Sequence, residues 1–334
     1  RNPDSSYTKL MSLENQYQSV DESKLNFNYV SEIVPYSSQH PENDFDEPCS
    51  FNNWTYTYNT GFYSFGKKLL TSTKETQYDD NGLNPIVTEK TFSYNNPSYF
   101  LTEQTLKDSK NDILRTETIY PEDIISPVAP VQKLVNLHRI SDPIEVKTYK
   151  KIDANPEKQI SHQKTEYKEW YTNGVFPEFV KTAKAGNGSE SRIQFHCYDN
   201  KGNPTEVSKK DGTKIYYVWG YNQTQPIAKI EGYTDAQLSA AQTKINTAIS
   251  ASNNDKDEVT ENVLRDKLEL LRDNFKLTDA RLTTFTYDPL IGVTSITDPR
   301  GETVYYEYDT FNRLKHVKDQ DGNILSENKY NYKQ

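Results

Sequence analysis

The stretch YDPLIGVTSITDPRGETVYYEYDTFNRLKHVKDQDGNI, residues 287–324, contains one pattern twice. A Tyr-Asp pair at 287 and another at 308 each begin a turn, and a second turn with Asp and Gly follows at 298–301 and at 321–322. Asp bonds to nearby backbone amides and Gly takes a positive φ without steric cost, so both favour hairpin tips. Between the turns, β-branched and aromatic residues alternate with polar ones, which is typical of strands. The stretch therefore predicts successive β-hairpins.

The pattern recurs with a nearly constant period. Tyr287 precedes Tyr308 by 21 positions, and Tyr308 precedes Tyr330 by 22. An upstream copy occupies 198–221 and has its own Asp-Gly turn in the middle. A repeat of two short strands cannot bury its faces alone, so each copy must stack on its neighbours. The sequence thus predicts a chain of hairpins joined in one antiparallel sheet.

The Tyr-Asp-x-x-Gly and Tyr-Asp-x-x-Asn openings resemble those of the YD-repeat, or Rhs-repeat, family. The resemblance is strong over 195–221 and 285–332, weaker over 54–183, and absent over 1–53. It implies an all-β fold in which hairpin repeats form a continuous curved or spiralling antiparallel sheet. Here that sheet would be a partial Rhs-type shell, in a short form without a toxin domain. The motif residues, which we expect to be structural, are Tyr198, Asp199, Gly202, Tyr287, Asp288, Gly292, Tyr308, Asp309 and Gly322.

One segment interrupts the β pattern. From residue 234 onward, apolar residues recur at helical spacing in two stripes separated by a short polar loop. The first stripe contains Leu238, Ala241, Ile245 and Ala248, and the second contains Leu264, Leu268, Leu271 and Phe275. Two such stripes predict an antiparallel α-helical hairpin inserted between two repeats.

The repeats and the insertion divide the chain into five expected parts. These are an N-terminal segment of unassigned type at 1–53, a degenerate β-hairpin repeat region at 54–183, a YD-repeat at 184–232, the inserted helical hairpin at 233–282, and C-terminal YD-repeats at 283–334.

Composition narrows the class of function. The 334 residues carry a net charge of −9, from 39 Lys and Arg against 48 Asp and Glu. Nucleic acid is therefore not an expected partner, because phosphate binding needs concentrated positive charge. No apolar run approaches the ~20 residues of a membrane-spanning helix, so we do not expect the chain to span a membrane. The 25 Tyr residues suit the walls of a thin sheet, since each packs a ring while its hydroxyl forms hydrogen bonds.

The sequence contains little that resembles an active site. The Tyr and Asp of the repeats recur at a fixed period, which favours a scaffold because catalysis needs one site and packing needs many. His196 and Cys197 are neighbours in a strand and so point to opposite faces. An acidic stretch at 42–47 lacks the frame of a calcium loop. We expect no catalytic residue, no metal site and no cofactor.

The two cysteines, Cys49 and Cys197, lack the spacing of a metal or redox motif. They could form one long-range disulfide or remain as two thiols, and the sequence leaves both alternatives open.

Clustered aromatic residues are the candidate binding residues, because an aromatic ring can stack on the apolar face of a sugar. One cluster includes Trp54, Tyr56 and Tyr58, and a smaller one includes Trp219 and Tyr221. Strand alternation places half of such residues on each face, so packing within the wall is the alternative. We assign these five residues to possible binding of a glycan or a partner.

The expected function is non-enzymatic. Repeats supply length and surface, and no convergent cluster of titratable groups is visible, which favours a scaffold for protein-protein or adhesive interactions. The resemblance implies a cell-surface or extracellular protein of a Gram-negative bacterium. Its expected partner is another surface protein of the same envelope, such as a larger adhesin or a component of the export machinery. The alternatives are a fragment of an Rhs-type toxin-encapsulating shell and a glycan-binding module.

Overall fold

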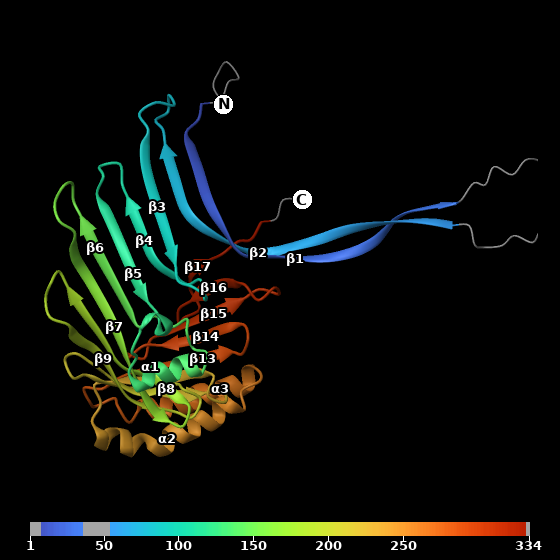
Figure 1. Ribbon diagram of the computed structural model, residues 1–334. Coiled ribbons are helices and arrows are strands. Elements are labelled where there is room, and N and C mark those ends of the chain that lie inside the picture. Colours follow the sequence, from blue (N-terminus) through green and yellow to red (C-terminus); the bar gives the residue numbers. More distant parts are fainter. Residues whose placement is uncertain (1–7, 36–53, 332–334) are drawn as a thin grey trace, which may run out of the picture. The chain divides into compact units, whose positions relative to one another are not determined.

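The computed structural model describes residues 8–35 and 54–331, and the side chains within them except those of residues 22, 24–35 and 54–65. Seventeen strands belong to one antiparallel sheet, and a pair of helices is inserted between two of its strands (Figure 1). The expected fold class is therefore confirmed: hairpins build an antiparallel sheet that carries an inserted helical hairpin. Among the described residues, no helix has both the length and the apolar character needed to cross a membrane.

The chain divides into two compact units, of which the first comprises Arg1–Arg115 and Ile152–Ala154. It contains β1 (Met11–Pro35), β2 (Trp54–Gln77), β3 (Ile86–Tyr94), β4 (Leu101–Lys107) and the start of β5 (Ile113–Ile119). β1 and β2 form a long hairpin, and β3 and β4 extend it by antiparallel pairing. Among the described side chains of this unit, only that of Thr76 is buried. Backbone pairing and cross-strand contacts therefore hold this unit together more than an apolar core does.

The second unit comprises residues 116–151 and 155–334. Its strands after β5 are β6 (Glu145–Lys151), β7 (Lys158–Tyr171), β8 (Gly174–Lys184), β9 (Glu190–Tyr198), β10 (Pro204–Lys209), β11 (Lys214–Gly220), β12 (Gln225–Glu231), β13 (Arg281–Asp288), β14 (Gly292–Thr297), β15 (Thr303–Tyr308), β16 (Leu314–Lys318) and β17 (Ile324–Glu327). Its helices are the 3-10 turn η1 (Pro121–Asp123), α1 (Ala129–Asn136), α2 (Asp235–Asn253) and α3 (Glu258–Arg272). From β6 to β17, each strand pairs with the next one in the sequence.

The helical hairpin begins where the sequence predicts it. Thr234 caps α2 in a reciprocal pair with Gln237, whose backbone N–H donates to the Thr234 hydroxyl while its side chain accepts from the Thr234 N–H. Asp257 caps α3 by accepting a hydrogen bond from the backbone of Thr260. These caps satisfy amides that the first helical turn leaves without partners.

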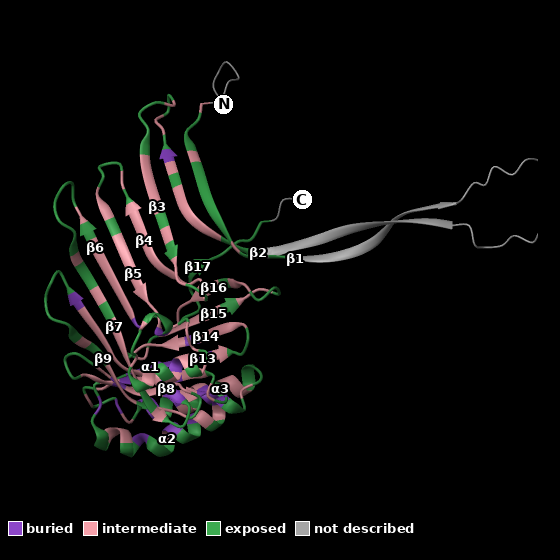
Figure 2. Ribbon diagram, in the orientation of Figure 1, coloured by how far each residue is buried: buried purple, intermediate pink, exposed green. Residues whose placement is uncertain are grey.

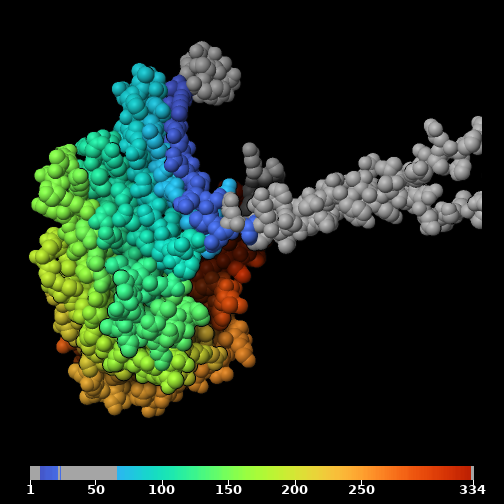
Figure 3. Space-filling model, viewed as in Figure 1, coloured from blue at the N-terminus to red at the C-terminus, as the bar shows by residue number. Residues whose placement is uncertain are grey.

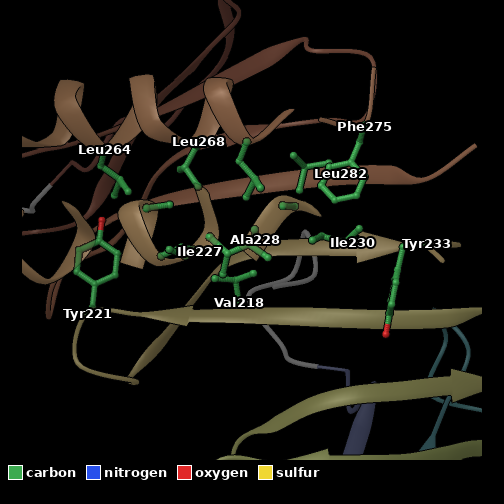
Figure 4. Packing of buried hydrophobic residues seen from close by; sticks show 14 residues of the cluster. Val218, Tyr221, Ile227, Ala228, Ile230, Tyr233, Leu264, Leu268, Phe275 and Leu282 are labelled. Carbon is green, nitrogen blue, oxygen red and sulfur yellow. The ribbon is translucent and has the colours of Figure 1, made fainter. Parts of the chain in front are cut away.

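The main core lies between the two helices and strands β11 to β13. Figure 2 shows buried residues gathered in this region, and Figure 4 shows them pointing toward one another from helix and strand. The buried members are Val218, Tyr221, Ile227, Ala228, Ile230, Tyr233, Ala241, Ile245, Ala248, Leu264, Leu268, Leu271, Phe275 and Leu282. The insertion thus supplies the apolar volume that the sheet lacks.

A smaller core holds α1 against the sheet of the second unit. Val131 and Leu134 of α1 pack with Ile144 and with Val175 of β8. The segment that carries α1 is drawn in green in Figures 1 and 3. The sequence pattern predicts degenerate hairpins for this segment, and α1 interrupts them.

Replacing Leu271 by alanine tests the contribution of the insertion to stability. Leu271 is 0% exposed between α3 and the sheet, so its truncation should lower the free energy of unfolding by about 3 kcal/mol. Leu270 is 47% exposed on the same helix, and Leu270→Ala should change the free energy by less than about 0.5 kcal/mol. Urea denaturation of both variants measures the difference. Equal effects would show that the helices do not share a core with the sheet.

Candidate functional site

One five-residue turn is used six times in the described chain. In each copy an Asp accepts, through one carboxylate oxygen, hydrogen bonds from the backbone N–H groups two and four positions later. The fourth residue has a positive φ and is Gly or Asn, as expected for a three-residue hairpin loop that ends in a left-handed residue. The opening aspartates are Asp79, Asp108, Asp199, Asp298, Asp309 and Asp319.

Hydrogen bonding lowers the carboxyl pKa of three of the opening aspartates, Asp79, Asp309 and Asp319, and so favours their charged form. The side-chain bond from Arg313 and the backbone bonds lower the pKa of Asp309, and the side-chain and backbone bonds from Asn323 lower the pKa of Asp319. Stability from a lowered carboxyl pKa is present above the unfolded value and is lost as the pH falls through the folded value. The turns are therefore built for the ionised aspartate.

A second regular feature joins each repeat to the one before it. An aromatic residue at the end of a strand donates a hydrogen bond to a backbone carbonyl of an earlier strand. The five bonds run from Tyr198 to Pro177 (2.9 Å), Trp219 to Pro204 (2.9 Å), Tyr287 to Pro226 (3.0 Å), Tyr308 to Val293 (3.0 Å) and Tyr330 to Leu314 (3.0 Å). We call this set the aromatic ladder.

The ladder is continuous because the residue whose carbonyl accepts one ladder bond lies opposite the aromatic donor of the preceding ladder bond in the sheet. Pro204 lies opposite Tyr198 in the sheet, and its carbonyl accepts from Trp219. Pro226 lies opposite Trp219, and its carbonyl accepts from Tyr287. The register shifts by one residue beside each of these pairs, and such a bulge disrupts the backbone pairing. The aromatic donor therefore satisfies a carbonyl at a place where the sheet is irregular.

The hydroxyls of Tyr198, Tyr287 and Tyr308 in the ladder have raised pKa values and are structural. Burial raises the pKa of Tyr287 to about 12 and raises the pKa of Tyr198 further. A neutral phenol donates its proton to a carbonyl, whereas a phenolate could not. The repeat Tyr and Asp side chains thus hold the sheet together.

The motif at 287–292 departs from the common turn. Leu290 has the positive φ, two residues after Asp288, and Gly292 does not occupy a left-handed position. A Cβ on Gly292 would lie 2.2 Å from the hydroxyl oxygen of Tyr308, so this glycine makes room for a ladder residue. Gly202 and Gly322, by contrast, are the left-handed residues of their turns.

The structure places Trp219 and Tyr221 in internal roles. Trp219, at the position of a repeat Tyr, is half-buried and uses its indole N–H in the ladder. Tyr221 is 6% exposed, donates its hydroxyl proton to Asp255 (2.8 Å), and accepts from the backbone N–H of Tyr287 (3.0 Å). The ring of Tyr221 therefore lies in the core and cannot stack on a sugar.

Of the other candidate residues from the sequence, the aromatic cluster in β2 and the two cysteines are only partly described by the structure. The backbone of Trp54, Tyr56 and Tyr58 lies in β2, but their side chains are outside the described residues. Cys197 is exposed on β9, whereas Cys49 is outside the described residues, so the structure tests neither alternative, a disulfide or two thiols.

Three features of the site were not predicted. Two of them are the turn at Asp108 and the role of Asp319 as the first residue of its turn. In both, an Asp is followed three residues later by Asn or Gly, and this spacing could have been found in the sequence. The role of Trp219 could have been found by counting 21 residues from Tyr198.

Among the described residues of the second unit, two clefts are large enough for a small molecule, and one of them is lined in part by the ladder residue Trp219. One, of about 470 Å³, lies between α2, β11 and the turn at Asp199, and is lined by aromatic and amide side chains. The other, of about 650 Å³, is lined by residues of β6 to β8 and of the segment that leads into α1.

The larger cleft combines apolar and paired charged groups. Ile124, Val131 and Ile144 are among its apolar residues. Burial favours a raised pKa for Glu145, yet the hydrogen bonds and charges of Lys147 and Lys164 hold its pKa below the usual value. The described residues contain no group of three or more His, Cys, Asp or Glu that could hold a metal ion.

No family model matches the chain, and no curated protein matches its sequence. One similar solved structure is that of TcdB2-TccC3-Cdc42, with a TM-score of 0.41 and 9% sequence identity over 79% of this chain and 15% of that chain. Another is that of TcdB2-TccC3-TEV, with a TM-score of 0.42 and 8% sequence identity over 95% of this chain and 16% of that chain. A third is that of the Photorhabdus luminescens Tc holotoxin pore, with a TM-score of 0.32 and 9% sequence identity over 78% of this chain and 11% of that chain. The chain spans between 11% and 16% of the length of these neighbours.

Replacing Asp199 by alanine tests the turn. Its carboxylate accepts from the backbone N–H groups of Lys201 and Asn203 and from the side chains of Asn203 and Gln223. Loss of these bonds should lower the free energy of unfolding by about 2 kcal/mol. Asp321→Ala, at the third position of the turn that Asp319 opens, is the matched control and should leave stability unchanged. Thermal unfolding that is alike for the two variants would contradict the role of the opening aspartate.

Replacing Tyr287 by phenylalanine tests one step of the ladder. The variant keeps the ring but leaves the Pro226 carbonyl without its donor, which should cost about 1 kcal/mol. Tyr306→Phe removes a hydroxyl that bonds to no described residue, and should cost nothing measurable. Urea denaturation compares the two, and an equal loss would mean that the ladder bond contributes nothing specific.

Proposed function

We propose that this chain is a non-enzymatic YD-repeat scaffold that presents surface to another protein. The observation that carries the proposal is the aromatic ladder. The Tyr and Trp donors recur at the repeat positions, and each is bonded within the sheet. Repeats of this kind add length and rigid surface with each copy, which is what a scaffold requires.

Exposed apolar side chains near β17 favour a protein partner. Ile324 and Leu325 of β17 are exposed, and so are Phe311 and Tyr330. The guanidinium of Arg313 lies over the rings of both Phe311 and Tyr330. Phe311 and Tyr330 lie together in this way around Arg313, and clustered apolar groups on a surface are typical of interaction sites. We name these four apolar residues the β17 surface.

The proposed setting is the cell surface or the extracellular space of a Gram-negative bacterium. The proposed partner is another protein of the same envelope, either a larger adhesin or a component of the export machinery. Both proposals rest on the resemblance of the Tyr-Asp repeats, and the β17 surface is where we expect the partner to bind.

A second candidate function is that of one part of the wall of an Rhs-type shell. The continuity of the ladder favours it, because each repeat is tied to its neighbour and a wall can grow by further copies. Antibodies raised against this chain and used on extracts of source cells distinguish the two functions. A reactive species near 38.6 kDa supports the scaffold, and a species several times larger supports the wall.

Site-specific photo-crosslinking in intact source cells tests the scaffold. A photoreactive residue at Leu325, which is 60% exposed on β17, should yield one discrete crosslinked protein. The same residue at Val259, which is 73% exposed on α3, is the control and should yield none. Leu325→Lys should reduce recovery of that partner by about tenfold, since it places a charge in an apolar contact. Identical crosslinks from both positions, or none from Leu325, would contradict the proposal.

A further inference from the structure

The cleft of about 470 Å³ between α2 and β11 has features of a ligand site that the scaffold function does not need. Its volume is within the usual range for small-molecule pockets. Tyr216, Tyr217 and Trp219 belong to its lining, and so do the amide residues Asn222 and Gln242. Aromatic residues beside side-chain amides form a surface that is partly apolar and partly hydrogen-bonding.

The backbone beside this cleft is held in an unusual conformation. Tyr221, Asn222 and Gln223 are three consecutive non-glycine residues with positive φ, at 48°, 56° and 64°. Such a run persists only where the surroundings determine it, and it is typical of functional sites. Here Ser252 accepts from the Tyr221 N–H and Asn253 accepts from the Asn222 N–H. The helical hairpin therefore fixes the loop that brings two amide residues to the cleft.

The charged groups at the cleft are already engaged. Four hydrogen bonds fill the carboxylate of Asp199, and the ammonium group of Lys201 donates to the backbone carbonyl of Asn222. The side-chain amide of Asn222 and the hydroxyl of Tyr217 bond to no described residue. The groups left available are therefore neutral donors and acceptors, together with the N–H groups of Lys201 that its bond to Asn222 does not use.

We propose that this cleft binds a neutral saccharide. Sugar hydroxyls are neutral donors and acceptors that match amides and phenols, and the C–H face of a sugar ring packs on aromatic and aliphatic groups. Ile245 and Ile249 of α2 add apolar lining to the same cleft. The ammonium group of Lys201 can still donate to a sugar hydroxyl, whereas a cation would find no free carboxylate among the described lining residues.

The test uses the full chain and four neutral disaccharides: cellobiose, maltose, lactose and chitobiose. Saturation-transfer NMR and titration calorimetry should show binding of at least one, with a Kd of about 1 mM. Gln242→Ala and Asn222→Gly should each weaken it about fivefold. Both positions are exposed, and glycine accepts the positive φ of Asn222, so neither variant should change thermal unfolding.

Thr243→Ala is the matched control, because Thr243 is exposed on the same helix and does not line the cleft. It should leave the Kd within about twofold of the unsubstituted chain. The proposal is overturned if none of the four sugars binds at about 10 mM. It is equally overturned if Gln242→Ala and Asn222→Gly bind as well as Thr243→Ala does.

Discussion

The aromatic ladder is the interaction on which the second unit depends. A bulge beside each repeat disrupts backbone pairing, and an aromatic residue of the next repeat donates to the carbonyl at that place. Tyr287, for example, bonds to Pro226, while the residue opposite Tyr287 accepts from Tyr308. Each repeat is thus completed by the one that follows it. Within uninterrupted repeats, successive donors are 21 or 22 residues apart, and each such donor reaches an acceptor 15 or 16 residues before it.

The helical hairpin adds a core to this arrangement without interrupting it. β12 and β13 pair directly although α2 and α3 lie between them in the sequence, and the ladder continues across the same join. Arg272 of α3 ties the insertion to the sheet, because its guanidinium donates to the carbonyls of Leu282 and Asp298 and to the Thr284 hydroxyl. Burial lowers the pKa of Arg272, and the charge and hydrogen bond of Glu269 oppose that shift.

The sequence predicted the features that depend on local chemistry. The left-handed conformation of Gly202 and the helix cap at Thr234 each depend on residues only a few positions away in the sequence. The turn and the helix therefore begin at the residues that the sequence indicates. Contacts between distant segments could not be predicted. For Tyr221 the sequence left open binding or packing within the wall, and the structure shows its hydroxyl bonded to Asp255 of the insertion and to the backbone of Tyr287. The sequence predicted Gly292 to be a turn residue. In the structure it leaves space for the hydroxyl of Tyr308, sixteen residues later.

Function in such a fold must lie where the chain departs from its repeat. A side chain that closes a turn or a ladder step is bonded internally, and changing it alters the sheet before it alters a ligand. The departures described here are the α1 segment, the helical hairpin and the β17 surface. Each introduces groups that the repeat does not require, such as the exposed Gln242 of α2 and the exposed Leu325 of β17. A repeat scaffold can acquire binding sites by insertion because its neighbour contacts keep the sheet intact around each new segment.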